Sequence, residues 1–273
     1  MPIITISRGT FAGGQQLADL LSKRLGFRCV SREMLYETVQ QTYGITAEDI
    51  SEIMEQAPTH LEHARERSDR LSLGQTRRRL FYALQASLCE LLHSSDVIYH
   101  GQAGHLLLPG VQHVLCVRLI ARRGQRINMA MERDRISKVA ASKLVDQVDS
   151  ERQRWTRSFY GVDWGDPALF DMVLNLDDLS IDDAVEITAH AAALPSYRVS
   201  EASSRAFADL CLSSAVMAEL LSQPQTIKLD IHEVMADGGT VKIVGNLNPS
   251  QRQEARRVAE QVQGVKGFEI VES

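Results

Sequence analysis

The sequence predicts an α/β protein in two parts: a three-layer domain with helices on both faces of a parallel sheet, then a small α+β domain. Over residues 3–190, short apolar runs alternate with longer helical patterns, which is typical of parallel strands joined by helical crossovers. From residue 205 the order changes to helix, strand, strand, helix, strand. Residues 194–204 break the first pattern and are typical of a linker. We therefore expect domains at 1–195 and 196–273.

The first thirty residues predict a β-α-β unit. The apolar run 3–7 ends at a glycine-rich turn and is typical of a buried strand. Leucines then recur at helical spacing until Gly26, a helix stop signal, and residues 27–31 form a second apolar run. Such a unit implies parallel strands with a right-handed crossover.

The same pattern continues to residue 193. Residues 33–79 are polar and helical in character, and a more apolar helix follows over 80–92. Further strands are expected at 96–101, 113–121 and 170–176, and the stretch 124–161 is helical and basic. Ser180 is placed to cap a helix over 181–193, with Asp183 three residues on.

The C-terminal part predicts an α-β-β-α-β module. A helix is expected over 205–221, strands at 226–234 and 240–247, a helix at 250–264 and a last strand at 268–272. Asp237-Gly238-Gly239 between the first two strands is a hairpin signal.

Composition and charge narrow the class of protein. Hydrophobic residues make up 44% and charged residues 24% of the 273 residues, as in ordinary globular proteins. The net charge of −5 argues against non-specific nucleic-acid binding. No apolar run reaches membrane-spanning length, and the start "MPIITIS" lacks the features of a signal peptide. We therefore expect a cytoplasmic protein without a transmembrane segment.

The cysteines and histidines predict no metal site. Most of the four cysteines lie in apolar stretches, where the thiol is usually a small core group, and none forms a CxxC pair. His100 and His105 flank a glycine-containing loop with no third ligand nearby in the sequence.

The turn after the first strand is a candidate phosphate site. A strand that runs through glycines into a helix start presents backbone N–H groups and the positive end of the helix dipole. Gly13 and Gly14 would let the main chain approach a phosphate closely. The alternative is that these glycines only make a tight turn.

Several segments together resemble the cytidylate kinase-like family of P-loop kinases. Ser7-Arg8, Ala12-Gly13-Gly14, Leu25-Gly26 and Arg32-Glu33 match its opening. The more specific match is an Asp-x-x-Arg pair followed by an aromatic-Gly-x-Asp-Trp-Gly-Asp-Pro motif and a Phe-Asp-x-Val-x-Asn strand. This match comprises Asp149, Arg152, Tyr160, Gly161, Asp163, Trp164, Asp166, Pro167, Phe170, Asp171 and Asn175.

The resemblance implies a kinase that uses ATP or another nucleoside triphosphate with Mg²⁺. It places Arg8, Arg126 and Arg152 as catalytic candidates that neutralise phosphate charge. The loop residues implied to bind the nucleotide are Thr10, Ala12, Gly13, Gly14, Gln15 and Gln16. Those implied to bind the phosphate acceptor are Arg32, Arg77, Arg78 and Asp149.

Two of these assignments have plain structural alternatives. The segment 152–157 would be a mobile lid in a monophosphate kinase, but it is also compatible with a solvated amphipathic helix. Arg77, Arg78 and Arg79 follow a run of mixed charge, as on a solvated helix face.

The loop departs from the family pattern. Phe11 replaces a loop glycine, and Gln102 stands where the family has an arginine after the third strand. Without a gap Gly14 takes the place of the loop lysine; counting from Gly9 instead puts Gln15 there and Gln16 in the hydroxyl position. Neither register supplies the usual cation or hydroxyl group.

The tail resembles a BON domain, a module usually associated with ligand or membrane-surface binding. The positions that match are Gly239, Val241, Gly245, Ala255, Ala259, Gly264 and Val265. This resemblance implies that the tail binds a small ligand or a partner protein.

The sequence is compatible with three functions. The first is phosphoryl transfer from a nucleoside triphosphate to a nucleoside monophosphate or similar small acceptor. The second is a catalytically degenerate module that binds a nucleotide or another anion and acts through the BON-like tail. The third is a scaffold whose glycine turn is empty. The sequence leaves the oligomeric state open, a homo-oligomer included.

Overall fold

The computed structural model describes residues 2–55, 72–93, 96–101 and 103–272. The chain forms two compact units, each described here by itself. The first comprises Met1–Met34, Met54–Thr59 and Ser94–Val199, and the second comprises Leu35–Ile53, His60–His93 and Ser200–Ser273. The passage at Val199–Ser200 lies inside the expected linker, while the boundary at 195/196 stays a prediction.

The first unit is built on a five-stranded parallel sheet in the order β2-β3-β1-β4-β5. The strands are β1 (Ile3–Arg8), β2 (Arg28–Ser31), β3 (Val97–His100), β4 (Val114–Ile120) and β5 (Met172–Asn175). All five predicted strands are present, each within a few residues of its expected bounds. Central β1 pairs with both β3 and β4, so the turn that follows it lies at the carboxyl edge of the sheet.

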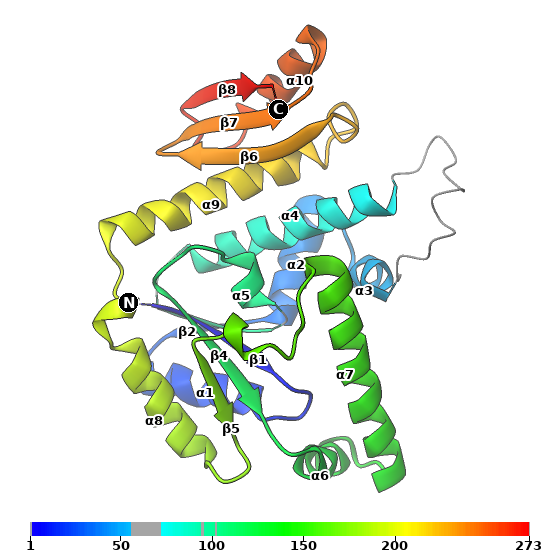
Figure 1. Cartoon of the computed structure of the whole chain (residues 1–273), viewed down its shortest axis with the longest axis vertical. Helices are drawn as coiled ribbons and strands as arrows, with labels where there is room; N and C mark the ends of the chain where they lie inside the picture. Colours follow the sequence, from blue (N-terminus) through cyan, green and yellow to red (C-terminus); the bar gives the residue numbers. More distant parts are fainter. Residues whose placement is uncertain (1, 56–71, 94–95, 102, 273) are drawn as a thin grey trace. The chain divides into compact units, whose positions relative to one another are not determined.

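Helices flank this sheet on both faces. The helices of the unit are α1 (Gly14–Leu25), α5 (Gly104–Leu107), α6 (Arg123–Asp134), α7 (Lys138–Tyr160) and α8 (Ile181–Ala192), and α2 (Arg32–Tyr43) begins in it. Ile4 and Ile6 of β1 join the core that α1 and α8 cover. Thr5 points to the opposite face, where a Cβ on Gly104 of α5 would lie 3.4 Å from its methyl group. The predicted three-layer α/β fold is confirmed (Figure 1).

The predicted helical stretch 124–161 forms two helices rather than one. Arg135 takes a left-handed conformation (φ 53°), which ends α6. Ser137 then caps α7, because its side chain accepts a hydrogen bond from the Ala140 N–H. The two helices pack against each other after β4 (Figure 1).

The second unit contains a three-stranded sheet in the order β6-β7-β8. Its elements near the C-terminus are α9 (Glu201–Leu220), β6 (Ile231–Asp237), β7 (Thr240–Gly245), α10 (Pro249–Ala259) and β8 (Gly267–Val271). This is the predicted α-β-β-α-β order, with an antiparallel hairpin at Gly238-Gly239. α4 (Leu73–Leu92) packs against α9, and α3 (Ala47–Glu55) starts in this unit.

The strand β6 begins five residues later than expected, at Ile231. Thr226, at the start of the expected strand, is buried in a turn, and its hydroxyl donates a hydrogen bond to the Leu220 carbonyl. The apolar residues that follow it are thus used in a turn rather than in the sheet.

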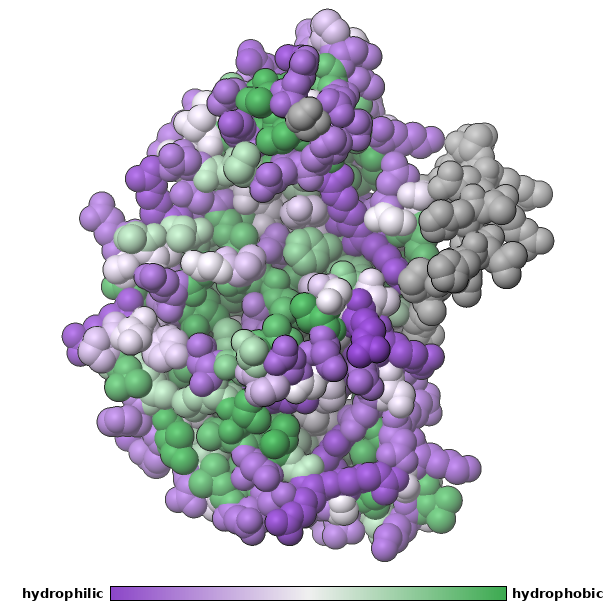
Figure 2. Space-filling model, viewed as in Figure 1, coloured by the Kyte–Doolittle hydropathy of each residue, from purple (hydrophilic) through white to green (hydrophobic). Residues whose placement is uncertain are grey.

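Hydrophobic side chains reach the surface of the first unit near its edge strand. Val173 of β5 is 38% exposed and Ile187 of α8 is 41% exposed. Figure 2 shows hydrophobic surface over this part of the molecule, interrupted by polar residues.

Because β7 closely approaches the start of β6, we expect any side chain at position 245 to destabilise the fold. A Cβ there would lie 2.4 Å from the Asp230 carbonyl oxygen and 3.0 Å from the Ile231 Cα, both backbone atoms. We expect Gly245→Ala to lower the free energy of unfolding by about 2–3 kcal/mol. Urea denaturation measures this, with Gly124→Ala as the control, since a Cβ at Gly124 meets nothing within 4 Å. Equal stability of the two variants would contradict the prediction.

Candidate phosphate-binding site

The turn between β1 and α1 has the backbone geometry of an anion site. Gly13 caps α1 in a left-handed conformation (φ 76°), which a glycine adopts without strain. No side chain caps the helix, and its first turn has no acidic residue. The first N–H groups of α1 and the positive end of its dipole are therefore available to an anion.

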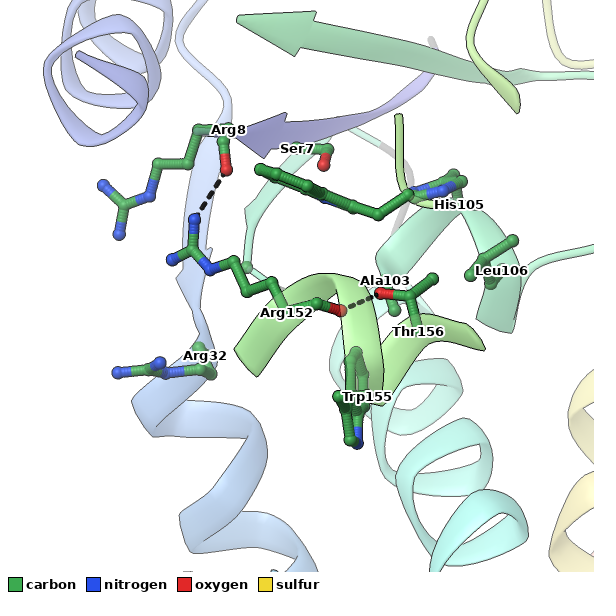
Figure 3. Close-up of a pocket in the computed structure, with 11 residues that line it drawn as sticks. Ser7, Arg8, Arg32, Ala103, His105, Leu106, Arg152, Trp155 and Thr156 are labelled. Atoms are coloured by element: carbon green, nitrogen blue, oxygen red, sulfur yellow. Dashed lines mark hydrogen bonds between the residues drawn. The ribbon is translucent and has the colours of Figure 1, made fainter. Parts of the chain in front are cut away.

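Three arginines converge on this turn. Arg8 ends β1, Arg32 begins α2 and Arg152 lies on α7. Figure 3 shows their three guanidinium groups on the same side of the pocket. Arg32 pairs with Glu33 at 2.9 Å. In the part of the chain that the structure describes, the Arg8 and Arg152 side chains form no ion pair with a carboxylate.

The cluster is electrostatically unfavourable without a ligand. Burial, and then the charge of Arg8, lower the pKa of Arg152 to about 10. Burial, and then the charge of Arg32, also lower the pKa of Arg8. Arg152 uses Nη1 to donate to the Arg8 carbonyl at 2.7 Å, whereas its buried Nε has no partner among the described residues. An anion between these groups would relieve both the desolvation and the repulsion.

Arg126 and Asp149 form an ion pair that holds the turn. The Arg126 Nη2 lies 2.7 Å from both carboxylate oxygens of Asp149, and its Nε donates to the Thr10 carbonyl at 2.7 Å. Arg126 is only 12% exposed. Of the predicted catalytic arginines, Arg126 is thus engaged with protein groups, and its visible role is to position the loop.

Phe11, the residue that replaces a family glycine, also ties the turn to α6 and α7. It takes a left-handed conformation (φ 59°), which is strained for a residue with a side chain. Its ring packs against the small core that α6 and α7 share, made up of Ile127, Ala130, Ala141 and Val145. This burial offsets the backbone strain and explains why the position tolerates a large side chain.

Two cavities meet at the arginine cluster. An open cleft of about 850 Å³ is lined by Thr10, Phe11, Gly13, Gln15 and Gln16 of the loop and by residues of α1 and α6. A pocket of about 20 Å³ extends to the other side, beneath Trp155 and Trp164. Arg8, Arg32 and Arg152 line both. Ala12, also predicted to bind nucleotide, is 1% exposed and packs in the core, and its assignment stays a prediction.

Arg118, which the sequence analysis did not select, supports the Trp164 motif. Its guanidinium lies 4.3 Å from the Trp164 ring centre and 5.3 Å from that of Phe170, and it donates to the Trp164 carbonyl. A charged residue inside the apolar run "VLCVRLI" was the available signal, because a buried arginine in a strand needs such partners.

Two of the residues predicted to bind the acceptor belong to the second unit. Arg77 and Arg78 belong to α4 in the second unit, where Arg78 donates to the His232 carbonyl at 2.8 Å. Their assignment to the acceptor stays a prediction.

Gln102 lies outside the described residues. Among the residues described, no three His, Cys, Asp or Glu side chains gather as metal ligands would.

The parallel sheet with a glycine turn after its central strand, and the helices around it, define a P-loop kinase fold. The profile of the Cytidylate kinase-like family matches residues 3–178. The chain belongs to this family. A search of curated proteins finds no match.

Solved structures resemble part of this chain at low sequence identity. An uncharacterized protein from Eubacterium ventriosum is 15% identical with a TM-score of 0.52, and the match covers 70% of this chain and 98% of that one. Shikimate kinase from Bacteroides thetaiotaomicron is 11% identical with a TM-score of 0.43, covering 71% and 99%. Shikimate kinase from Acinetobacter baumannii, in complex with shikimate, is 15% identical with a TM-score of 0.38, covering 70% and 92%. Within the described residues, no helix is long and apolar enough to span a membrane.

Because the Arg126–Asp149 pair is largely buried, we expect that breaking it lowers the stability of the fold more than breaking a neighbouring exposed pair. Asp149→Asn would leave the Arg126 guanidinium with little solvent and no countercharge. We expect a loss of about 1–3 kcal/mol in the free energy of unfolding. Asp146→Asn is the control, because Arg123 and Asp146 also link α6 to α7 but are 54% and 56% exposed, and we expect a clearly smaller loss there. Chemical denaturation of both variants measures the difference; an equal loss would contradict the prediction.

His105 predicts a loss of stability in acid. Burial, and then the charge of Arg118, lower the pKa of His105 from 6.5 to about 4. The unfolded chain therefore binds the proton more tightly, and folding stability falls as the pH drops from 6.5 towards 4. We expect the contribution of His105 to this loss to reach about 3 kcal/mol. Denaturation at pH 7 and pH 4.5 measures it, and His105→Asn should reduce the pH dependence; an unchanged dependence would contradict the assignment.

Proposed function

We propose that this protein transfers a phosphoryl group from a nucleoside triphosphate, ATP or another, to a nucleoside monophosphate or a similar small acceptor. The observation that carries the proposal is the arginine cluster at the turn after β1. Arg8 and Arg152 are partly buried cations that form no ion pair with a carboxylate within the described residues, and both line the cleft in front of α1.

Phosphoryl transfer suits such a site. The reaction demands positioning and positive charge around the transferred group more than covalent chemistry by the protein. Guanidinium groups can donate two parallel hydrogen bonds to a phosphate, and they are worth more where water is excluded. The first N–H groups of α1, from Gly14 to Gln16, would bind the phosphates from the other side.

The two cavities suggest where each substrate binds. The cleft of about 850 Å³ has room for a nucleotide, and the loop residues line it. The pocket of about 20 Å³ shares Arg8, Arg32 and Arg152 with the cleft and has room for a water-sized group, so it would take only the reacting oxygen of the acceptor. Arg8, Arg32 and Arg152 would then surround the phosphoryl group as it passes from one cavity to the other.

Magnesium would come with the nucleotide. In kinase sites Mg²⁺ is bound largely by substrate phosphates and water, with few protein ligands. Gln15 and Gln16 carry no hydroxyl that could serve as the usual loop ligand. We assign no protein ligand to the ion and derive no step from it.

A second function is supported by a different observation. Arg126 is engaged with Asp149 and the Thr10 carbonyl, and the loop has neither lysine nor hydroxyl at its end. A site with these features would bind a nucleotide or another anion with little or no turnover. In that case the second unit, whose tail resembles a BON domain, would carry the signal to a small ligand or partner protein.

Nucleotide binding and turnover separate the two functions. We expect ATP, GTP or another nucleoside triphosphate with Mg²⁺ to raise the melting temperature and to bind in calorimetry. Arg152→Ala should weaken this binding about 10- to 100-fold, because a charge-assisted contact is lost. Arg24→Ala is the control, since Arg24 is half exposed and pairs with Glu186 on the surface.

Turnover is then assayed with the nucleotide that binds, using nucleoside monophosphates and small hydroxyl compounds as acceptors. Product formation supports the kinase, and binding without turnover supports the sensor. No binding of any nucleotide or other phosphate would contradict both and leave the scaffold.

A further inference from the structure

The Arg8 side chain runs directly over Gly14, the first residue of α1. A Cβ placed on Gly14 would lie 2.4 Å from the Arg8 Cδ, 2.9 Å from its Cβ and 3.0 Å from its Cγ. Real side chains do not approach so closely, and Cβ of Arg8 is fixed by the end of β1. A side chain at position 14 is therefore excluded while Arg8 keeps this conformation.

The backbone of Gly14 does not itself demand glycine. Gly14 is an ordinary helical residue, in contrast to Gly13, whose φ is 76°. The space taken by the Arg8 stem is thus the reason for a glycine at position 14.

The Arg8 guanidinium is held where a loop cation would act. The backbone carbonyl of Arg8 accepts a hydrogen bond from Arg152, and this contact fixes the backbone from which the Arg8 side chain starts. From there the stem crosses the first residue of α1, and the guanidinium lines both cavities. Within the described residues it forms no ion pair and donates no hydrogen bond to the protein.

We infer that Arg8 and Gly14 act as a pair that replaces the loop lysine. In the ungapped register position 14 aligns with that lysine; it carries no side chain, and the Arg8 guanidinium occupies the space that the lysine would take. The cation then comes from the strand that precedes the loop rather than from the helix that follows it. Its ligand is the terminal part of a polyphosphate chain, as in a nucleoside triphosphate. This inference rests on the proposed phosphate site.

The pairing makes a reciprocal test possible. In Arg8→Ala the cation is lost, and we expect binding of inorganic tripolyphosphate to weaken about 10- to 100-fold. Gly14→Lys in the wild-type background collides with the Arg8 stem, and we expect its melting temperature to fall by about 3–8 °C. In the double variant Arg8→Gly/Gly14→Lys all three colliding atoms of Arg8 are removed, its Cβ included, and a lysine stands in the usual place. We expect it to recover both the melting temperature and tripolyphosphate binding to within about fivefold of wild type.

Calorimetry and thermal melting of the full chain read out the test. Gly124→Lys is the matched control, because it also lies in the first turn of a helix but has no atom within 4 Å of its Cβ position. Arg24→Ala controls for the loss of one positive charge. Arg8→Lys, which keeps a shorter cation, should bind more tightly than Arg8→Ala.

The outcomes separate this inference from the proposed function. If wild type binds tripolyphosphate and Arg8→Ala binds it equally well, the inference is overturned and the phosphate site stands. The same holds if Gly14→Lys is as stable as Gly124→Lys, or if the double variant is no better than Gly14→Lys. If wild type binds neither tripolyphosphate nor any nucleotide, both the inference and the proposed function are overturned.

Discussion

Two hydrogen bonds from arginines to backbone carbonyls fix the turn after β1, and the geometry of the site depends on them. Arg126 donates to the Thr10 carbonyl and Arg152 to the Arg8 carbonyl, both at 2.7 Å. The residues that follow, Gly13, Gln15 and Gln16 at the start of α1, line the cleft. The same contacts join the loop to α6 and α7, so the position of the loop depends on these two helices.

The arginines around the turn differ in whether a carboxylate pairs with them. Arg126 has a full partner in Asp149, and its burial costs little as long as that pair is intact. Arg8 and Arg152 are partly buried without such a partner, and burial together with the neighbouring arginine charges lowers the pKa of each. A folded protein keeps desolvated like charges together only at a cost in stability, and such clusters are concentrated at functional sites. This contrast distinguishes an arginine that supports the loop from those that would meet a ligand.

Departures from the family pattern are accommodated by local packing. Phe11 takes a strained conformation that glycine would adopt freely, and the apolar core of α6 and α7 buries its ring. Gly14 leaves room for the stem of Arg8. Each substitution in the loop therefore has a physical counterpart in a neighbouring element.

The sequence by itself determined the strands of both sheets and most of the helices between them, because apolar periodicity, glycine stops and caps such as Ser180 act over a few residues. It did not show that 124–161 forms two helices or that α5 is present. Through the family resemblance it also pointed to the glycine turn as a phosphate site, to Arg8, Arg126 and Arg152 as catalytic candidates, and to Arg32 as one of the residues that bind the acceptor. Only the tertiary structure decided which arginine is engaged and which is without a partner, because Arg126 meets Asp149 across two helices. It likewise revealed that Arg118 packs against Trp164 and that the stem of Arg8 lies over Gly14. Both contacts are made by tertiary packing, because spacing along the sequence does not give the distance between two side chains in the fold.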